Sequence, residues 1–180
     1  MTAEQNFLFS PSLISPAVAS SFPPGYTIRP LARDDYHRGF FQCLQTLTAT
    51  GDITEQQFLE RYDWMKAHGQ EWYYCVVIVD ERNDRIVGTG AMVVERKFIH
   101  NLGTIGHIED ISICKDHQGQ KFGLRLINAL DSIAVNVGCY KTILDCAERN
   151  EGFYAKCGYS RAGVEMAHYY EEAKSEYERG

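Results

Sequence analysis

Four residues with chemically useful side chains stand among apolar neighbours in the second half of the chain. Glu109 and Asp110 interrupt a β-branched run, Asp145 lies near the end of another apolar run, and Tyr154 follows a short polar segment. A buried carboxylate without a partner is costly, so an acid in an apolar strand indicates a cleft, a salt bridge or a ligand. A phenol can donate a hydrogen bond or a proton.

Each of these four residues also has a purely structural interpretation. One carboxylate of the Glu109–Asp110 pair can face solvent at a strand end while the other forms a salt bridge. Asp145 can cap a neighbouring helix. Tyr154 stands at helical spacing from apolar residues and can belong to the core.

A glycine-bearing loop follows the strand that carries the two adjacent acids. The strand is predicted over residues 105–113, and the loop is Gln118-Gly119-Gln120-Lys121-Phe122-Gly123. An apolar helix then runs to Val137, before Gly138. The first turn of a helix leaves backbone N–H groups unpaired and carries the positive end of the helix dipole, which suits a phosphate. The loop matches neither the Walker pattern nor the dinucleotide fingerprint; an ordinary strand–turn–helix connection is the alternative.

The remaining pattern predicts one α/β domain with the element order β-α-α-β-β-β-α-β-α-β. Strands are expected over residues 26–31, 72–80, 86–95, 105–113, 141–146 and 159–170. The second and third of these are apolar on both faces, so we expect them inside a sheet that is covered on each side. The strand 141–146 is also largely apolar, so we expect it to be buried.

Helices are expected between these strands. Asp34 or Asp35 caps the first, whose apolar face consists of Phe40, Phe41, Leu44 and Leu47. A capping box at 54–57 starts the second, which ends at Gly69. The last helix is short, near 152–157, and ends at Gly158.

Composition excludes several classes of protein. The 180 residues fit a single domain, and 18 basic against 24 acidic residues give a net charge of −6, so a nucleic-acid partner is not expected. No apolar run reaches the length of a membrane span. The six cysteines lack metal-binding spacing, so we expect no metal and interpret them as reduced, buried residues of an intracellular protein.

The first 25 residues differ from the rest in composition. All five prolines lie in the first thirty positions, and the first basic residue is Arg29. We predict a flexible arm over 1–25, a single domain over 26–170 and an acidic tail over 171–180. The apolar residues of the arm are expected on the domain surface or on a partner subunit: Phe7, Leu8, Phe9, Leu13 and Ile14. Secretory and mitochondrial signals need basic residues here, so a cytoplasmic location is predicted.

The chain resembles the glucosamine 6-phosphate N-acetyltransferase family, part of the GCN5-related N-acetyltransferases. The loop is similar to the family's diphosphate loop, Gln/Arg-x-x-Gly-x-Gly/Ala, although Lys121 stands where the first glycine usually lies. Further matching segments follow in register at 95–103, 106–111, 138–141, 144–146, 153–159 and 162–166. The resemblance covers roughly residues 26–166 and implies the GCN5-related fold, a mixed central β-sheet flanked by helices.

The resemblance also implies an activity, direct acetyl transfer from acetyl-CoA to the amine of glucosamine 6-phosphate, on the way to UDP-N-acetylglucosamine. It implies that Tyr154 assists the leaving sulfur and that the Ile111 amide, in a bulged strand, binds the oxyanion. Asp145 and Glu109 are then expected beside the attacking amine. Because an amino-sugar amine is only weakly basic, a positioned acceptor can suffice without a strong base.

The remaining expected contacts follow from the same resemblance. Those for acetyl-CoA are Asp110, Ile111, Ile113, Gln118, Gly119, Gln120, Lys121, Phe122, Gly123, Asn150, Tyr154 and Lys156. Those for the sugar phosphate are Thr48, Lys97, Phe98, Ile99, His100, Glu109, Asp110, Lys141 and Asp145. Lysine and histidine suit a phosphate as donors. A homodimer that exchanges the segment after Gly158 is implied as well.

Two other functions stay open. The first is acetylation of another amine, a polyamine or a protein lysine; a polyamine enzyme would want an acidic groove without the Lys97 and His100 pair. The second is a non-catalytic acyl-CoA-binding module, in which Tyr154 and Asp145 would not affect turnover. His107 and His117 are expected to be structural, and no cysteine has a base near it in sequence that would favour an acyl-cysteine intermediate.

Overall fold

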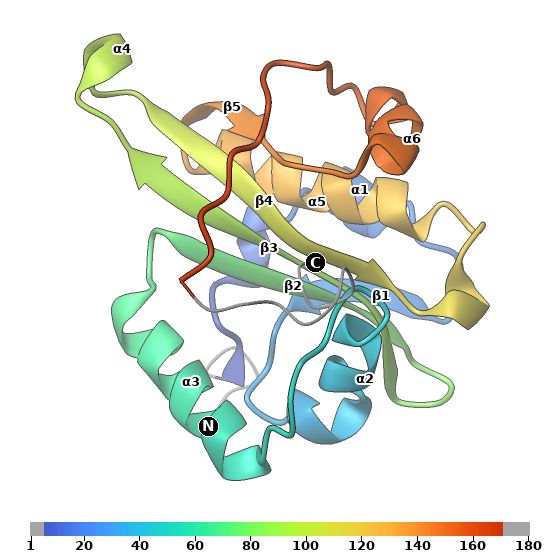
Figure 1. The fold of residues 1–180 in the computed structure, drawn as a ribbon. Coiled ribbons are helices and arrows are strands. Elements are labelled where there is room, and N and C mark those ends of the chain that lie inside the picture. The colour runs from blue at the N-terminus through green and yellow to red at the C-terminus, as the bar shows by residue number, and fades with distance from the viewer. Residues whose placement is uncertain (1–5, 171–180) are drawn as a thin grey trace.

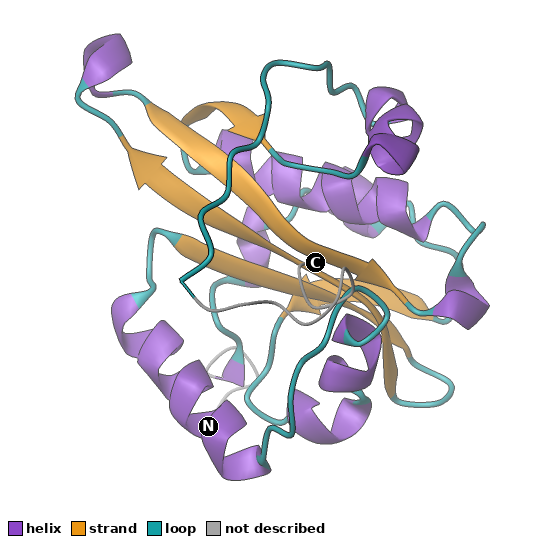
Figure 2. Cartoon of the chain, viewed as in Figure 1, coloured by secondary structure: helices purple, strands orange, loops and turns teal. Residues whose placement is uncertain are grey.

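The computed structural model describes residues 6–170, and a five-stranded sheet with helices on both faces forms its centre (Figures 1 and 2). The strands are β1 (Tyr26–Pro30), β2 (Tyr73–Asp80), β3 (Arg85–Arg96), β4 (Thr104–Ile113) and β5 (Cys139–Ile143). Their spatial order is β1-β2-β3-β4-β5; β5 alone is parallel to its neighbour. The predicted acidic tail, 171–180, and residues 1–5 lie outside the described residues.

Six helices accompany the sheet in the described part of the chain, and single 3₁₀ turns connect several of them. They are α1 (Pro16–Ala19), α2 (Phe40–Leu44), α3 (Glu55–His68), α4 (Ile99–Leu102), α5 (Phe122–Asn136) and α6 (Glu151–Lys156). The capping box predicted for α3 is confirmed, since the Thr54 hydroxyl accepts from the Gln57 N–H while the Gln57 side chain accepts from the Thr54 N–H. Gly138 and Gly158 follow α5 and α6 with positive φ.

The core is divided by the sheet into two layers. Helix α5 packs against alternate residues of β2 and β3, among them Val76, Ile78 and Met92. Helices α2 and α3 cover the other face, which contains Val77 and Ala91. Because both faces are buried, β2 and the middle of β3 are largely apolar on both faces, as the sequence predicts.

The helix expected after Asp34 or Asp35 is different in the structure. Residues Asp35–Arg38 form a 3₁₀ turn, Gly39 adopts a φ of 83°, and α2 ends before Leu47 is reached. Asp35 is buried and makes an ion pair with Arg29 at 2.7 Å while accepting from the Ala32 N–H at 2.7 Å. The capping prediction is wrong: no side chain caps this turn, and the Asp35 carboxylate instead forms an ion pair with the Arg29 guanidinium inside the fold.

The last two predicted strands also need correction. The strand expected over 141–146 is β5, which ends at Ile143; as an edge strand it leaves Lys141 exposed, and Asp145 and Cys146 lie exposed in the loop after it. The stretch 160–170 forms no strand among the described residues, although a strand was expected there. A strand needs hydrogen-bonding partners along its edge, and the described chain offers this stretch none.

Residues 6–25 pack against the domain and do not form the flexible arm that composition predicts. Leu8, Ile14 and Phe22 are buried, and the Leu8 N–H donates to the Leu31 carbonyl at 2.9 Å. Helix α1 lies against α5, and Asn136 of α5 donates to the Leu13 carbonyl at 2.9 Å. The segment therefore contributes to the hydrophobic core.

Candidate active site

A cleft opens where β4 and β5 separate. Their parallel pairing ends at His107 and Ile143, whereas β4 continues to Ile113, and α6 stands above the gap (Figure 1). The cleft has a volume of about 640 Å³ and is bounded by the end of β4, the loop before α5, the first turn of α5 and α6. It lies at the place expected for acetyl-CoA.

Ten of the residues predicted to bind acetyl-CoA line this cleft together. They are Ile111, Ile113, Gln118, Gly119, Lys121, Phe122, Gly123, Asn150, Tyr154 and Lys156. Asp110 and Gln120 belong to the same segments but are not part of the lining.

Four further lining residues were not among the predicted ligand contacts: His117, Leu124, Phe153 and Cys157. The sequence could have indicated them in two ways: His117 and Leu124 are next to the loop 118–123, and Phe153 and Cys157 are close to Tyr154, in or directly after the same short helix. Gly123 permits the close approach of α5 and α6, since a Cβ on it would lie 3.0 Å from the Phe153 ring.

The loop before α5 keeps its shape despite the lysine in it. Gly119 has a φ of 79°, and Lys121 adopts φ 62° and ψ 18° immediately before the helix. Lysine thus takes the left-handed conformation for which glycine is favoured, at a cost of about 1 kcal/mol. Gln118 donates to the Ile113 carbonyl at 3.1 Å and Arg125 donates to the Gln120 carbonyl at 2.8 Å, which holds the loop in place.

A bulge in β4 lies beside the cleft, as the resemblance implies. Thr89 pairs with Ser112 and Ala91 with Glu109, so Gly90 alone faces both Asp110 and Ile111. Asp110 has a φ of 55°. A Cβ on Gly90 would come 2.5 Å from the Ile111 side chain, so glycine lets this side chain lie close to β3.

Three carboxylates influence one another next to the bulge. Burial raises the pKa of Glu109, and the negative charges of Asp110 and Asp145 raise it further, while His107 opposes them. Burial also raises the pKa of Asp110. Glu165, from the segment after α6, acts on Glu109 in the same direction as the other acids. The charges of the predicted acids Asp110 and Asp145 thus both act on Glu109, and we refer to the three residues as the acidic group.

Tyr154 is half-buried on α6, and its hydroxyl makes no hydrogen bond to another residue of the described range. Burial raises its pKa to about 12, so the phenol keeps its proton near neutral pH. A neighbouring tyrosine fixes the end of α6: the Tyr159 hydroxyl donates to Asp131 of α5 at 2.7 Å and lies 2.8 Å from the Thr142 hydroxyl of β5. The tyrosine at the cleft is thus the one with a free hydroxyl.

The predicted phosphate ligands gather at the far tip of the β3–β4 hairpin. Lys97 makes an ion pair with Glu95 at 2.7 Å. The His100 ring lies 5.2 Å from the Tyr140 ring, and the Lys141 ammonium lies 5.9 Å from the same ring on β5. Phe98 is 95% exposed, Ile99 is exposed beside it, and His100 is left-handed like the two residues after it. Thr48 lies apart, in the loop between α2 and α3.

Comparison with known proteins identifies the family. The acetyltransferase (GNAT) family model matches residues 31–159. A glucosamine 6-phosphate N-acetyltransferase 1 of Dictyostelium discoideum is 42% identical over 152 residues, covering 84% of this chain and 96% of that protein. The Candida albicans glucosamine 6-phosphate N-acetyltransferase is 42% identical over 145 residues, covering 80% and 95%. The chain belongs to the glucosamine 6-phosphate N-acetyltransferases of the GNAT family.

The fold agrees with this assignment. The crystal structure of glucosamine-6-phosphate N-acetyltransferase from Arabidopsis thaliana superposes with a TM-score of 0.78 at 35% identity, covering 81% of this chain and 99% of that one. The mixed sheet flanked by helices is therefore the GNAT fold, as predicted from the sequence. As a member of this family, the chain is an acyltransferase, and GNAT enzymes use acetyl-CoA.

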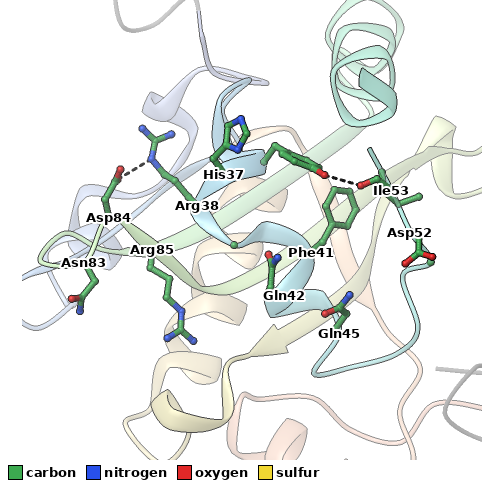
Figure 3. Close-up of a pocket in the computed structure, with 13 residues that line it drawn as sticks. His37, Arg38, Phe41, Gln42, Gln45, Asp52, Ile53, Asn83, Asp84 and Arg85 are labelled. Carbon is green, nitrogen blue, oxygen red and sulfur yellow. Dashed lines mark hydrogen bonds and ion pairs between the residues drawn. The ribbon is translucent and has the colours of Figure 1, made fainter. Parts of the chain in front are cut away.

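A second cavity of this GNAT domain, about 790 Å³, lies beside α2 and the β2–β3 turn and contains no predicted site residue (Figure 3). Its two arginines already have partners: Arg38 binds Asp84 at 2.8 Å, and Arg85 binds Asp116, which is not part of its lining, at 3.1 Å. The cavity is larger than the cleft.

Among residues 6–170, no cluster of three or more histidine, cysteine or acidic side chains is arranged to hold a metal ion. In the same part of this acetyltransferase, no helix has the length and apolar character needed to cross a bilayer. The cysteines of the described chain are all free, with Cys43, Cys75 and Cys114 buried but Cys146 exposed.

Proposed function

We propose that the protein transfers the acetyl group of acetyl-CoA to the amine of glucosamine 6-phosphate by a direct, sequential reaction in the cytoplasm, without a metal. The observation that carries the proposal is the cleft itself, because the bulged β4 and Tyr154 meet on its walls next to an acidic group. Relatives covering most of the chain carry the same activity in their names.

The chain's own groups suit each step. The loop from Gln118 to Gly123 presents backbone N–H groups at the start of α5, where a diphosphate is bound favourably. The Ile111 N–H, at the bulge, stabilises the oxyanion of the tetrahedral intermediate. Tyr154, which keeps its proton, assists the departing thiolate. Asn150 and Lys156 border the same cleft and hold the pantetheine arm and a phosphate.

The acidic group receives the amine. Glu109, Asp110 and Asp145 together attract an ammonium group and then hold the neutral amine that attacks. A polyamine would fit this acidic group as well. Acetylation of a polyamine is therefore distinguished from acetylation of glucosamine 6-phosphate by the part of the site that binds the phosphate. The basic residues Lys97, His100 and Lys141 favour the sugar phosphate over a polyamine or lysine.

Lys97 and the acidic group lie far apart within one chain. Ala91 pairs with Glu109, and Lys97 is six residues further on, which is roughly 20 Å of extended chain. A hexosamine phosphate is much shorter than this. We therefore propose a homodimer in which the hairpin tip of one subunit serves the acidic group of the other.

The dimer also explains the segment after α6. Residues 160–170 lack a partner strand, and Val164, Met166 and Tyr170 are exposed (Figure 1). Exchange of this segment would bury these side chains on a partner subunit. We expect static light scattering of the purified protein to give twice the chain mass of 20.5 kDa at micromolar concentration; a monomer would contradict both the exchange and the shared site.

The raised pKa of Glu109 leads to a prediction for pH dependence. A carboxyl group accepts a proton or holds an ammonium only when ionised, so activity is present above its pKa and is lost as the pH falls through it. Since that pKa lies above the ordinary 4.5, the acid limb of kcat should appear above pH 4.5. Glu109→Gln should remove this limb when both substrates are saturating; an unchanged limb would exclude Glu109.

The substrate is tested by offering four amines in parallel with acetyl-CoA: glucosamine 6-phosphate, glucosamine, spermidine and a lysine peptide. Release of CoA is followed by chromatography, since the six cysteines would react with thiol reagents. Turnover with glucosamine 6-phosphate alone supports the proposal and shows a need for the phosphate. Turnover with another amine would change the substrate, and binding of acetyl-CoA without any turnover would favour the binding module.

A further inference from the structure

One wall of the cleft contains a histidine to which the proposed reaction gives no role. His117 lines the cleft from the turn before the phosphate loop. Its ring stacks on Phe122 with centroids 6.2 Å apart and an interplanar angle of 19°, and it meets the Tyr26 ring edge-on at 5.8 Å. Only 12% of the side chain is exposed, so the ring is held in a defined place.

An acid behind the histidine fixes the position of its protons. His117 Nδ1 lies 2.9 Å from Asp116 Oδ1, and Arg85 grips the same carboxyl group with Nη1 at 3.1 Å and Nη2 at 3.4 Å. His117 and Arg85 hold the pKa of Asp116 below its usual range, so Asp116 is a carboxylate and can only accept. Nδ1 therefore carries a proton, and Nε2 has no hydrogen-bond partner among the described residues.

Charged and aromatic groups from several elements surround the ring. Asp80, at the end of β2, interacts electrostatically with His117, and Tyr26 of β1 and Phe122 of α5 contribute only neutral rings. The Arg85 guanidinium binds Asp116, and Asp116 in turn lies against the imidazole of His117. A protonated ring would thus face two carboxylates.

The charge of the whole cleft points to an anionic ligand. Its lining contains two lysines, Lys121 and Lys156, as well as His117, and no carboxylate among the described residues that form it. The cleft is therefore basic, whereas the whole chain has a net charge of −6. A basic cleft in an acidic protein attracts phosphate groups selectively.

We propose that His117, positioned by Asp116 and Arg85, binds a phosphate group of CoA as an imidazolium. Nε2 takes up one proton from solvent and donates it in a hydrogen bond to a phosphate oxygen, and no covalent bond changes. Binding of CoA is therefore coupled to proton uptake. The inference rests on the proposed function, because it assumes that this cleft holds CoA.

The test is calorimetric titration of the full chain with CoA and, separately, with 3′-dephospho-CoA, in buffers of different ionisation enthalpy. We expect His117→Gln to weaken CoA binding about tenfold, the effect of one charge-assisted hydrogen bond, and to abolish the proton uptake seen with the wild type. Asp116→Asn should weaken binding in the same direction by a smaller factor. If dephospho-CoA binding is insensitive to His117→Gln, the contact is with the 3′-phosphate; equal weakening of both ligands assigns the diphosphate.

Lys115→Ala is the matched control. Lys115 is exposed in the same turn, two residues away, and does not line the cleft, so removal of its charge should change CoA affinity less than twofold. Unchanged affinity and proton uptake in His117→Gln, with the wild type binding CoA, would overturn this inference alone. Failure of the wild type to bind CoA would overturn the proposed function instead.

Discussion

Replacement of Tyr154 by phenylalanine is expected to lower kcat about 100-fold and to leave the KM for acetyl-CoA within about threefold. The change removes one hydroxyl and keeps the ring, which contacts Phe153 with centroids 4.9 Å apart. Since this hydroxyl bonds to no other described residue, its loss should not destabilise the fold. Steady-state kinetics and the thermal midpoint of the variant measure the two effects separately.

Tyr159→Phe is the matched control for this variant. It also removes one phenolic hydroxyl from the same region, but that hydroxyl is bonded to Asp131 and Thr142. We expect Tyr159→Phe to lower the free energy of unfolding by about 1 kcal/mol and to change kcat only a few-fold. If instead the two variants lose activity equally, Tyr154 acts through packing and not as a donor to the thiolate.

The pH profile gives a second check on Tyr154. Because burial raises its pKa to about 12, the phenol remains a donor throughout the neutral and mildly alkaline range. Loss of kcat between pH 8 and pH 10 in the wild type would therefore have to come from another group. A basic limb in this range that disappears in Tyr154→Phe would contradict the assigned pKa and the role as a protonated donor.

Local signals in the sequence were sufficient for several elements, including some of those that bound the cleft. The capping box at Thr54, the glycines after α5 and α6, and the polar loop before α5 depend on residues within one or two turns of each other. Such signals are readable because their physical causes are local. The cleft residues near Gln118 and Tyr154 were found for the same reason.

Long-range contacts account for the elements that were missed. Asp35 looks like a helix cap until Arg29, six residues earlier on β1, is placed beside it. The five prolines of the first thirty residues predict an arm, but Ile14 and Phe22 belong to the core layer that contains α5. A strand was expected after Gly158 from its apolar residues, and hydrogen bonding to a neighbour decides whether that strand forms. Sequence patterns do not show which of these contacts form, even where the partners lie as close in sequence as Arg29 and Asp35.

The active site shows the same division. The bulge and the loop are local, whereas the roughly 20 Å between Lys97 and Glu109 follows only from the register of β3 on β4. The sequence favours a structural interpretation of His117 because lone histidines near strand ends are usually structural, and it does not show that Arg85 and the cleft lie nearby. Strained backbone also occurs at candidate site residues: His100, Asp110 and Lys121 are non-glycine residues with positive φ.

Replacement of Asp145 by alanine is expected to lower kcat/KM for glucosamine 6-phosphate about 100-fold without changing the thermal midpoint. Asp145 is exposed after β5 and has no hydrogen bond or ion pair within residues 6–170, so the fold does not depend on it. The variant lacks one of the charges that receive the amine. Loss of one such electrostatic contact in a catalytic site costs roughly 3 kcal/mol of transition-state stabilisation. Kinetics with each substrate varied in turn should show the KM for acetyl-CoA unchanged.

Two further variants decide whether the charge of Asp145 is the cause. Glu148→Ala removes a nearby exposed acid whose ion pair within residues 6–170 is a long one, 3.8 Å, to Arg161, and should leave kcat/KM within twofold. Asp145→Asn keeps the shape and removes the charge. Because the charge of Asp145 raises the pKa of Glu109, Asp145→Asn should move the acid limb of kcat to lower pH. A limb that stays in place while activity falls would mean that Asp145 contacts the sugar by hydrogen bonding alone, and full activity in Asp145→Asn would remove the charge from the mechanism.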